Sequence, residues 1–177
     1  MKLIAIHSNP DAYELIADSA ITLSGRPWFI PELEGGCSWQ LIPMTAIRIS
    51  RLGKSISAKF ASRYFDAITI GVRLMPLNAQ GEPLSSVTSL IDFGIALGEW
   101  IKVEQDPTTL NIGNSVIELQ PAIERATEEI CKLSKFATLK IGDTLLLPTN
   151  IEPIQASVGL NVTANIDGKN VMTATLR

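Results

Sequence analysis

The segments AIRISRLGKSI (residues 46–56) and RYFDAITIG (residues 63–71) decide the fold class of this chain. Apolar, β-branched residues fill the start of the first segment and the end of the second, and such residues favour strands. A glycine-lysine turn inside the first segment is followed by Ser57, a suitable N-cap. We therefore expect a helix over residues 57–66 and a strand over residues 67–72.

Outward from this unit the pattern predicts further strands. Short apolar runs bounded by turn residues indicate strands at residues 2–6, 21–23, 28–30, 144–147, 156–166 and 171–176. Asp167-Gly168, between the last two, is a strong hairpin signal. Pro43 removes a backbone donor near the start of the strand at residues 41–50. That strand is expected to begin late or to lie at an edge there.

Two other stretches predict helical structure. Residues 9–19 are expected to hold a short helical turn. Pro121 suits the first position of a helix in which glutamates precede Lys132 and Lys135, an order that complements the helix dipole. The expected fold class is mainly β with two or more short helices, an α+β protein forming one domain over residues 1–177.

Composition limits the class of function. The 177 residues are 46% hydrophobic and 19% charged, which is typical of a globular protein. The net charge is −3 with scattered Lys and Arg, so a nucleic-acid partner is not expected. No apolar run approaches the ~20 residues of a membrane-spanning helix, so no membrane partner is expected either. Cys37 and Cys131 match no metal spacing, which favours a cytoplasmic protein with reduced thiols.

Three stretches resemble the fumarylacetoacetate hydrolase family, and they occur in the family's order. The first is the unit at residues 46–71. The second joins Leu90-Ile91-Asp92 to Gly98-Glu99-Trp100-Ile101, and the third is TLKIGDTLL at residues 138–146. The resemblance implies a mixed β-roll, here shortened, like that of 2-hydroxyhepta-2,4-diene-1,7-dioate isomerases. It also implies hydrolase, isomerase or decarboxylase chemistry on a 1,3-dicarbonyl or 2-oxo acid.

The family's chemistry depends on Mg²⁺ or Mn²⁺, which stabilises an enolate as a Lewis acid. A Glu-x-Glu pair on one strand and an Asp on another hold the ion. Carried over residue by residue, the glutamates fall at Ile42 and Met44, the aspartate at Arg73 and the family's catalytic lysine at Ser89. Hard cations need oxygen ligands, and a guanidinium repels them. The sequence therefore predicts a degenerate site with no metal cofactor and no assigned catalytic residue.

A few residues remain candidates for binding. Arg73 is suited to hold a carboxylate through its bidentate fork, and the resemblance adds Asn9 and Thr149 as possible ligand contacts. Glu32-Leu33-Glu34 has the spacing of the metal pair, and a register shift would make it a metal site. Gly35-Gly36 directly after it, and the charge of Arg73, count against that reading.

Three functions stay open from the sequence, in descending rank. The first is a non-catalytic subunit or regulator, forming a homodimer or a heterodimer with an active paralogue. The second is a binding module for a small oxo-acid, held by Arg73. The third is an active hydrolase, isomerase or decarboxylase that uses Glu32, Glu34 or Arg73 in place of the usual site.

Overall fold

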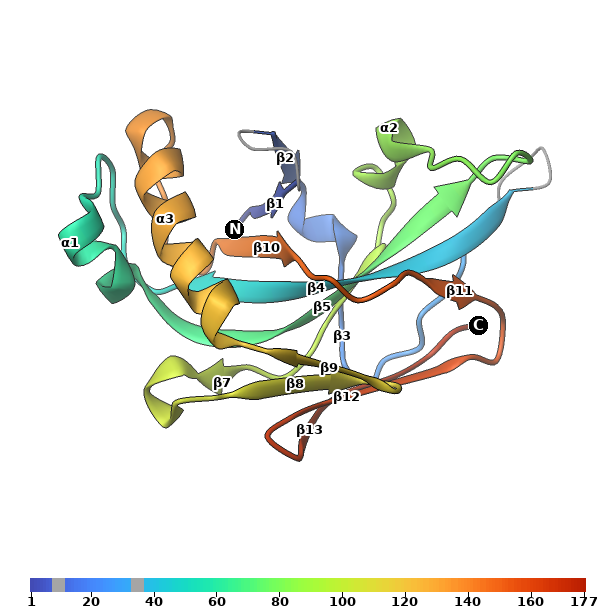
Figure 1. Cartoon of the computed structure of the whole chain (residues 1–177). Helices are drawn as coiled ribbons and strands as arrows, with labels where there is room; N and C mark the ends of the chain where they lie inside the picture. The colour runs from blue at the N-terminus through green and yellow to red at the C-terminus, as the bar shows by residue number, and fades with distance from the viewer. Residues whose placement is uncertain (8–11, 33–36) are drawn as a thin grey trace.

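The fold is built around β4 (Ser38–Ile49) and β5 (Phe65–Leu77), which pair antiparallel over almost their full lengths. The computed structural model describes residues 1–7, 12–32 and 37–177. Within it the two strands form the centre of a nine-stranded sheet with the order β2-β1-β10-β4-β5-β6-β3, in which β11 also pairs with β4 and β7 with β5 (Figure 1). The other strands of this sheet are β1 (Leu3–Ile6), β2 (Tyr13–Ile16), β3 (Ile21–Leu23), β6 (Ile95–Leu97), β7 (Ile101–Lys102), β10 (Thr144–Pro148) and β11 (Ile154–Ala156).

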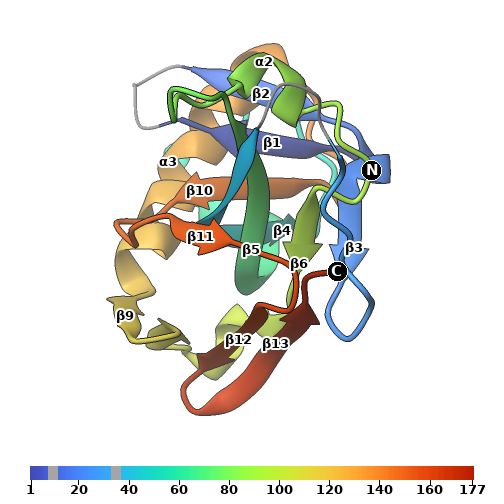
Figure 2. The same cartoon turned by 90° about the vertical axis from the view of Figure 1, so that its right-hand side faces the viewer.

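A second sheet has four antiparallel strands in the order β13-β12-β8-β9. Its strands are β8 (Thr109–Ile112), β9 (Ser115–Glu118), β12 (Asn161–Ile166) and β13 (Lys169–Thr175). Three α-helices, α1 (Ala58–Ala61), α2 (Ser85–Thr88) and α3 (Gln120–Phe136), and three 3₁₀ turns, η1 (Asp18–Ala20), η2 (Ser62–Tyr64) and η3 (Val103–Gln105), complete the described chain. Figure 2 shows the second sheet below the first. The expectation of a mainly β protein with a few short helices is confirmed.

The first sheet has two differently packed faces. One faces the second sheet and α3 across the main core, which contains Leu41, Ile47, Ile68, Ile70 and Leu145. The other, here called the inner face, carries a smaller buried cluster: Leu3, Ala5, Ile16, Ala20, Met44, Ala46, Ile95, Leu97 and Leu146. Alternate residues along each strand point to opposite faces, so each central strand contributes to both clusters.

The sheet is curled around the inner face. Its two edge strands, β2 and β3, are consecutive in the chain and are joined through the three-residue η1. Strands β2 and β5 lie four places apart in the sheet, which in a flat sheet would separate them by roughly 19 Å. A side chain of β5 nevertheless bonds directly to one of β2, as described below, so the curl brings the two strands face to face.

Several local expectations need correction. The helical turn expected over residues 9–19 is wrong at Tyr13–Ile16, which form strand β2, but a 3₁₀ turn, η1, does begin at Asp18. Of the two alternatives for Pro43, the late start is wrong, since β4 begins at Ser38, whereas the edge position holds locally. Strand β11 pairs with β4 up to Leu41 and β10 only from Met44 onward, so Pro43 falls in the gap between these two neighbours. The missing donor therefore costs no ladder bond on that side.

Other expectations hold with adjusted bounds. The helix expected at residues 57–66 is α1 followed directly by η2, with Ser57 at the N-cap position. The Asp167-Gly168 hairpin is confirmed, and both residues have positive φ. Hydrogen bonds from the Thr108 hydroxyl and from the backbone N–H groups of Thr108 and Thr109 lower the pKa of Asp167 to about 2. Within the described ranges, no helix has the length and apolar character needed to cross a bilayer.

Asp143 fastens the N-terminal strand to the centre of the sheet. It directly precedes β10, and its side chain is 1% exposed. One carboxylate oxygen accepts from the Lys2 backbone N–H at 3.1 Å. The other accepts from the Lys140 N–H at 2.8 Å and pairs with Lys2 Nζ at 2.8 Å. This explains why a Gly-Asp turn precedes the strand that pairs in parallel with β1.

Replacing Asp143 tests this attachment. Asp143→Ala is expected to lower the free energy of unfolding by about 3 kcal/mol, because two N–H groups and an ammonium lose their shared acceptor. Equilibrium unfolding in urea at pH 7 measures it. Asp92→Ala, which removes an exposed carboxylate, is the control and should stay within about 0.5 kcal/mol. Equal effects of the two substitutions would contradict the role of Asp143.

Candidate functional site

The positions identified by the family resemblance meet at one end of the inner face. Ile42 and Met44 are two residues apart on β4 and therefore point to the same side of the sheet. Arg73 is the direct cross-strand partner of Ile42, and Gly71 is the partner of Met44. The resemblance implies the positions on β4 and those on β5 from separate stretches of sequence. Their register brings the inferred metal positions together as neighbours.

Arg73 is buried and already bound. Its side chain is 5% exposed, and its guanidinium donates two hydrogen bonds to Glu14 of β2. Nη1 lies 2.7 Å from Oε2, and Nη2 lies 2.7 Å from Oε1. This is the parallel, two-point pairing that binds arginine most strongly to a carboxylate. His7 Nε2 lies 3.4 Å from Glu14 Oε2 at the exposed edge of the pair.

The charges around Glu14 favour its ionised form. Burial by itself raises the pKa of this carboxyl, but the hydrogen bonds and positive charge of Arg73 outweigh burial, so the pKa lies below its usual value. His7 and a hydrogen bond with the Ser89 side chain act in the same direction. Ser89, the position matched to the family's catalytic lysine, therefore lies beside the same carboxylate. Glu14 thus links Ser89 to Arg73, and Arg73 is the cross-strand neighbour of Ile42.

A divalent cation does not fit the residues at these positions. Met44 is 6% exposed and belongs to the inner-face cluster, with Ile42 packed against that cluster. Neither side chain offers an oxygen ligand, and the carboxylate of Glu14 is engaged by Arg73. Arg73 Nε is a buried donor with no partner among the described groups, and a donor N–H calls for a hydrogen-bond acceptor and not for a cation. No cluster of three or more metal-binding side chains occurs in the described part of the chain.

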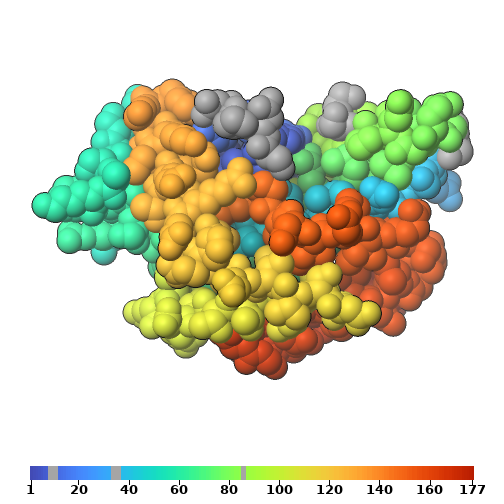
Figure 3. Space-filling model, in the orientation of Figure 1, coloured from blue at the N-terminus to red at the C-terminus, as the bar shows by residue number. Residues whose placement is uncertain are grey.

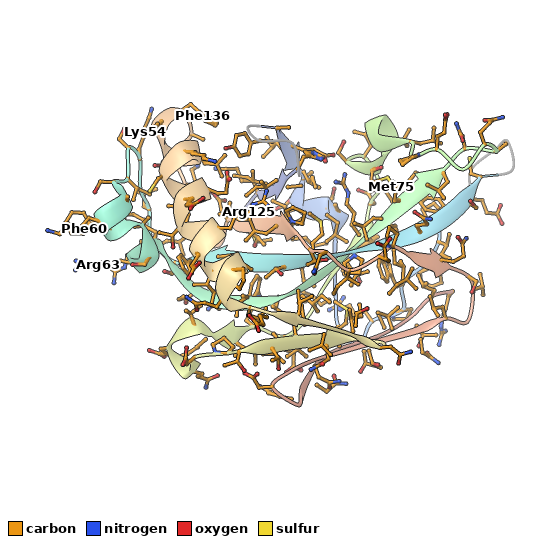
Figure 4. The ribbon with its side chains drawn as sticks, in the orientation of Figure 1. Lys54, Phe60, Arg63, Met75, Arg125 and Phe136 are labelled. Atoms are coloured by element: carbon orange, nitrogen blue, oxygen red, sulfur yellow. The ribbon has the colours of Figure 1, made fainter. Side chains whose placement is uncertain are left out.

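The remaining sequence candidates lie elsewhere. Thr149 follows β10, and its hydroxyl donates to the Pro43 carbonyl at 2.8 Å. It lines a pocket of about 440 Å³ together with Thr45, Leu147 and Arg125. Thr45 and Leu147 face away from the inner face, so Thr149 and Arg73 are on opposite sides of the sheet. Figure 3 shows this hollow between α3 and the end of β10, and Figure 4 shows Arg125 projecting from α3.

Two sequence candidates cannot be placed, and one is exposed. Asn9 and Glu34 lie outside the described residues. Glu32 is exposed and makes no ion pair within the described ranges. The sequence reasoning missed Glu14, which holds the site together. The signal was present, since a single carboxylate in the run Tyr13-Glu14-Leu15-Ile16 becomes notable once that run is read as a strand.

Comparison with known proteins bears on the fold. No family model matches the chain, and no curated protein matches it. Solved structures do match, over 99% of the chain. One is a Yersinia pestis protein assigned to the fumarylacetoacetate hydrolase family, with 18% identity, 92% of its own chain covered and a TM-score of 0.76.

Two further matches carry enzyme names. Fumarylpyruvate hydrolase from Pseudomonas aeruginosa, solved with Mn²⁺ and pyruvate, has 14% identity, 89% coverage of its chain and a TM-score of 0.77. The 2-hydroxyhepta-2,4-diene-1,7-dioate isomerase of Mycobacterium marinum has 20% identity, 73% coverage and a TM-score of 0.75. The chain has the fumarylacetoacetate hydrolase fold. At these identities the fold is what the proteins share, and the activity of a fumarylacetoacetate hydrolase-like chain has to be argued from its residues.

The Arg73–Glu14 pair makes a prediction about stability. Glu14→Ala leaves a buried guanidinium without its anion and is expected to cost about 3–5 kcal/mol of unfolding free energy. The double variant Glu14→Leu/Arg73→Met removes both charges and should recover most of that loss. Urea unfolding of the three proteins at pH 7 measures both steps. A double-variant cost as large as the single-variant cost would contradict the expected recovery.

The lowered pKa of Glu14 predicts the direction of the pH dependence. A carboxyl with a folded pKa below its unfolded value of about 4.5 stabilises the protein fully above that unfolded pKa. Its contribution is lost as the pH falls through the folded pKa. Unfolding free energy measured below about pH 5 should therefore fall less steeply for Glu14→Leu/Arg73→Met than for the wild type. Parallel acid profiles of the two proteins would contradict this assignment.

Proposed function

We propose that this chain is a non-catalytic protein built on the fumarylacetoacetate hydrolase fold, and that it works as a subunit or regulator. The supporting observation is the Arg73–Glu14 ion pair at the positions matched to the metal site. Metal-dependent enolate chemistry needs a cation that is free to bind a developing oxyanion. The charge of Arg73 is neutralised within the chain, and the apolar side chains of Ile42 and Met44 replace the matched carboxylates.

The proposed partner is a second copy of the chain or an active paralogue, and the proposed compartment is the cytoplasm. One surface next to the site supports an interface. Met1, Leu15 and Leu90 are 63%, 68% and 78% exposed, and they line one hollow together with Ser89. Exposed apolar side chains that gather in this way are typical of interaction surfaces. Sedimentation velocity of the purified chain, alone and mixed with a candidate paralogue, tests this part of the proposal.

Binding of a small oxo-acid remains a second candidate, because one observation favours it. Arg73 Nε is a buried donor without a partner in the described structure, and a ligand carboxylate would supply an acceptor. Such a ligand would compete with Glu14 for the guanidinium. If this function holds, pyruvate or oxaloacetate should bind more tightly to Glu14→Gln than to the wild type in calorimetric titration. Absence of binding by both proteins would exclude it.

The absence of a metal-dependent reaction is tested with metal alone and then with substrate. Millimolar Mn²⁺ or Mg²⁺ is expected to leave the melting temperature unchanged relative to KCl of equal ionic strength, because a ligand stabilises only the state that binds it. The P. aeruginosa fumarylpyruvate hydrolase, solved with Mn²⁺, serves as the positive control. Acylpyruvate and oxaloacetate should not be turned over. A saturable, Mn²⁺-specific rise in melting temperature, or metal-dependent turnover, would overturn the proposal.

A further inference from the structure

The positive charge of this chain is unevenly distributed. No Asp or Glu occurs from residue 35 to residue 65, whereas five cations do: Arg48, Arg51, Lys54, Lys59 and Arg63. The whole chain has 15 Lys and Arg against 18 Asp and Glu. The rest of the chain therefore has ten cations and all 18 acids. A protein with a net charge of −3 carries one segment of opposite sign, which a count over the whole sequence conceals.

The structure places four of these cations on one protrusion. Residues 50–64, here called the basic knob, connect β4 to β5 and include α1 and η2. Figure 3 shows the knob at one end of the molecule, and Figure 4 shows Lys54, Phe60 and Arg63 at that end. Arg51, Lys54, Lys59 and Arg63 are all exposed. Leu52 and Phe60 are also exposed, at 65% and 42%.

The knob is held firmly despite this exposure. Gly53 exchanges two backbone hydrogen bonds with Leu139, at 3.0 and 2.9 Å. The Ile56 N–H donates to the buried Ser134 hydroxyl at 2.9 Å, and the Ser55 N–H donates to the Ser134 carbonyl at 2.7 Å. Two of the knob's own side chains, Ile56 and Ala61, are buried and anchor it to the rest of the protein. The surface is therefore preformed, which lowers the entropic cost of binding a partner.

The four cations of the knob form no ion pair within the described ranges. Arg51 and Arg63 line a shallow pocket of about 360 Å³ whose two carboxylates are already engaged. Asp66 binds Arg48 through two hydrogen bonds, at 2.9 and 2.8 Å, and Glu104 pairs with Lys102 at 3.1 Å. The two arginines thus present positive charge that no neighbouring acid neutralises.

The aromatic ring of the knob is flanked by charge. The Arg63 guanidinium lies 5.1 Å from the Phe60 ring centroid, and Lys59 Nζ lies 5.7 Å from it. Cations at these distances are attracted to the ring, so they stay near an apolar group. Carboxylates of a partner would meet Arg51 and Arg63, and an apolar side chain between them would meet Leu52 and Phe60. This combination suits a peptide that alternates acidic and apolar residues.

We propose that the basic knob is a docking surface for an acidic, apolar-containing segment of a partner protein. A long polyanion or an anionic bilayer fits less well, because the chain outside the knob has 18 acids against 11 cations and would repel an extended negative surface. A short segment contacts the knob alone. The proposal does not depend on the loss of catalysis, since the knob and the Arg73–Glu14 pair lie at opposite ends of β4 and β5.

The probe is a fluorescein-labelled peptide of about ten residues, glutamate-rich with a central leucine and phenylalanine, followed by fluorescence anisotropy at low salt. The wild-type chain is expected to bind it saturably, and Arg51→Glu/Arg63→Glu should weaken binding about ten-fold or more. Arg26→Glu/Lys169→Glu changes the net charge equally at exposed positions elsewhere and should weaken binding less than two-fold. Circular dichroism confirms that each variant is folded.

Two comparisons identify the occupant. An all-glutamate peptide without the apolar residues should bind more weakly, and phosphatidylserine vesicles and single-stranded DNA should compete poorly. No binding of the mixed peptide, or equal weakening by the two double variants, would overturn the docking surface. Tighter binding of vesicles or DNA than of the peptide would overturn the acidic protein segment as its occupant. None of these outcomes bears on metal binding. The docking surface and the proposed loss of catalysis can therefore fail independently of each other.

Discussion

The antiparallel register of β4 and β5 is the constraint on which the rest of the structure depends. Both strands are largely buried on both faces, so each residue must face either the main core or the inner face. A slip of one residue would exchange these two sets and place Arg73 in the main core, among Ile68, Ile70 and Val72. There the guanidinium would lose its two hydrogen bonds to Glu14, and an unpaired charge is costly to bury. Hydrophobic burial and the position of one arginine therefore specify the same register.

The inner face limits which charged groups the site can hold. Curling the sheet encloses a small volume, and whatever charge lies in it has to be compensated inside it. A metal ion and several carboxylates would be one neutralising arrangement. A guanidinium and one carboxylate, here Arg73 and Glu14, form another with fewer charges. Apolar residues such as Met44 and Leu146 fill the rest. The fold is thus compatible with either arrangement, which is why likeness of fold does not determine activity.

The sequence predicted the parts of this site that lie within continuous motifs. Ile42, Met44, Arg73 and Ser89 could be named because each follows a stretch with recognisable neighbours. Glu14 could not, since it reaches Arg73 only through the curl, and no local pattern encodes how far a sheet curls. The sequence left two readings of Pro43 open for a similar reason, because the choice between a late start and a local edge depends on where β10 and β11 end. Scattered Lys and Arg do not reveal the basic knob, whose informative feature in the sequence is the absence of acids from residue 35 to residue 65.

The connection between β4 and β5 differs physically from the strands that it joins. The strands are constrained on both faces, so a substitution there must preserve volume and charge balance at once. The knob is anchored by a few backbone hydrogen bonds and by Ile56 and Ala61, while most of its side chains point to solvent. Its exposed residues can therefore change with little cost in stability. An unbalanced cluster of cations adds like-charge repulsion at such a place, and the proposed docking of an acidic segment would relieve that repulsion.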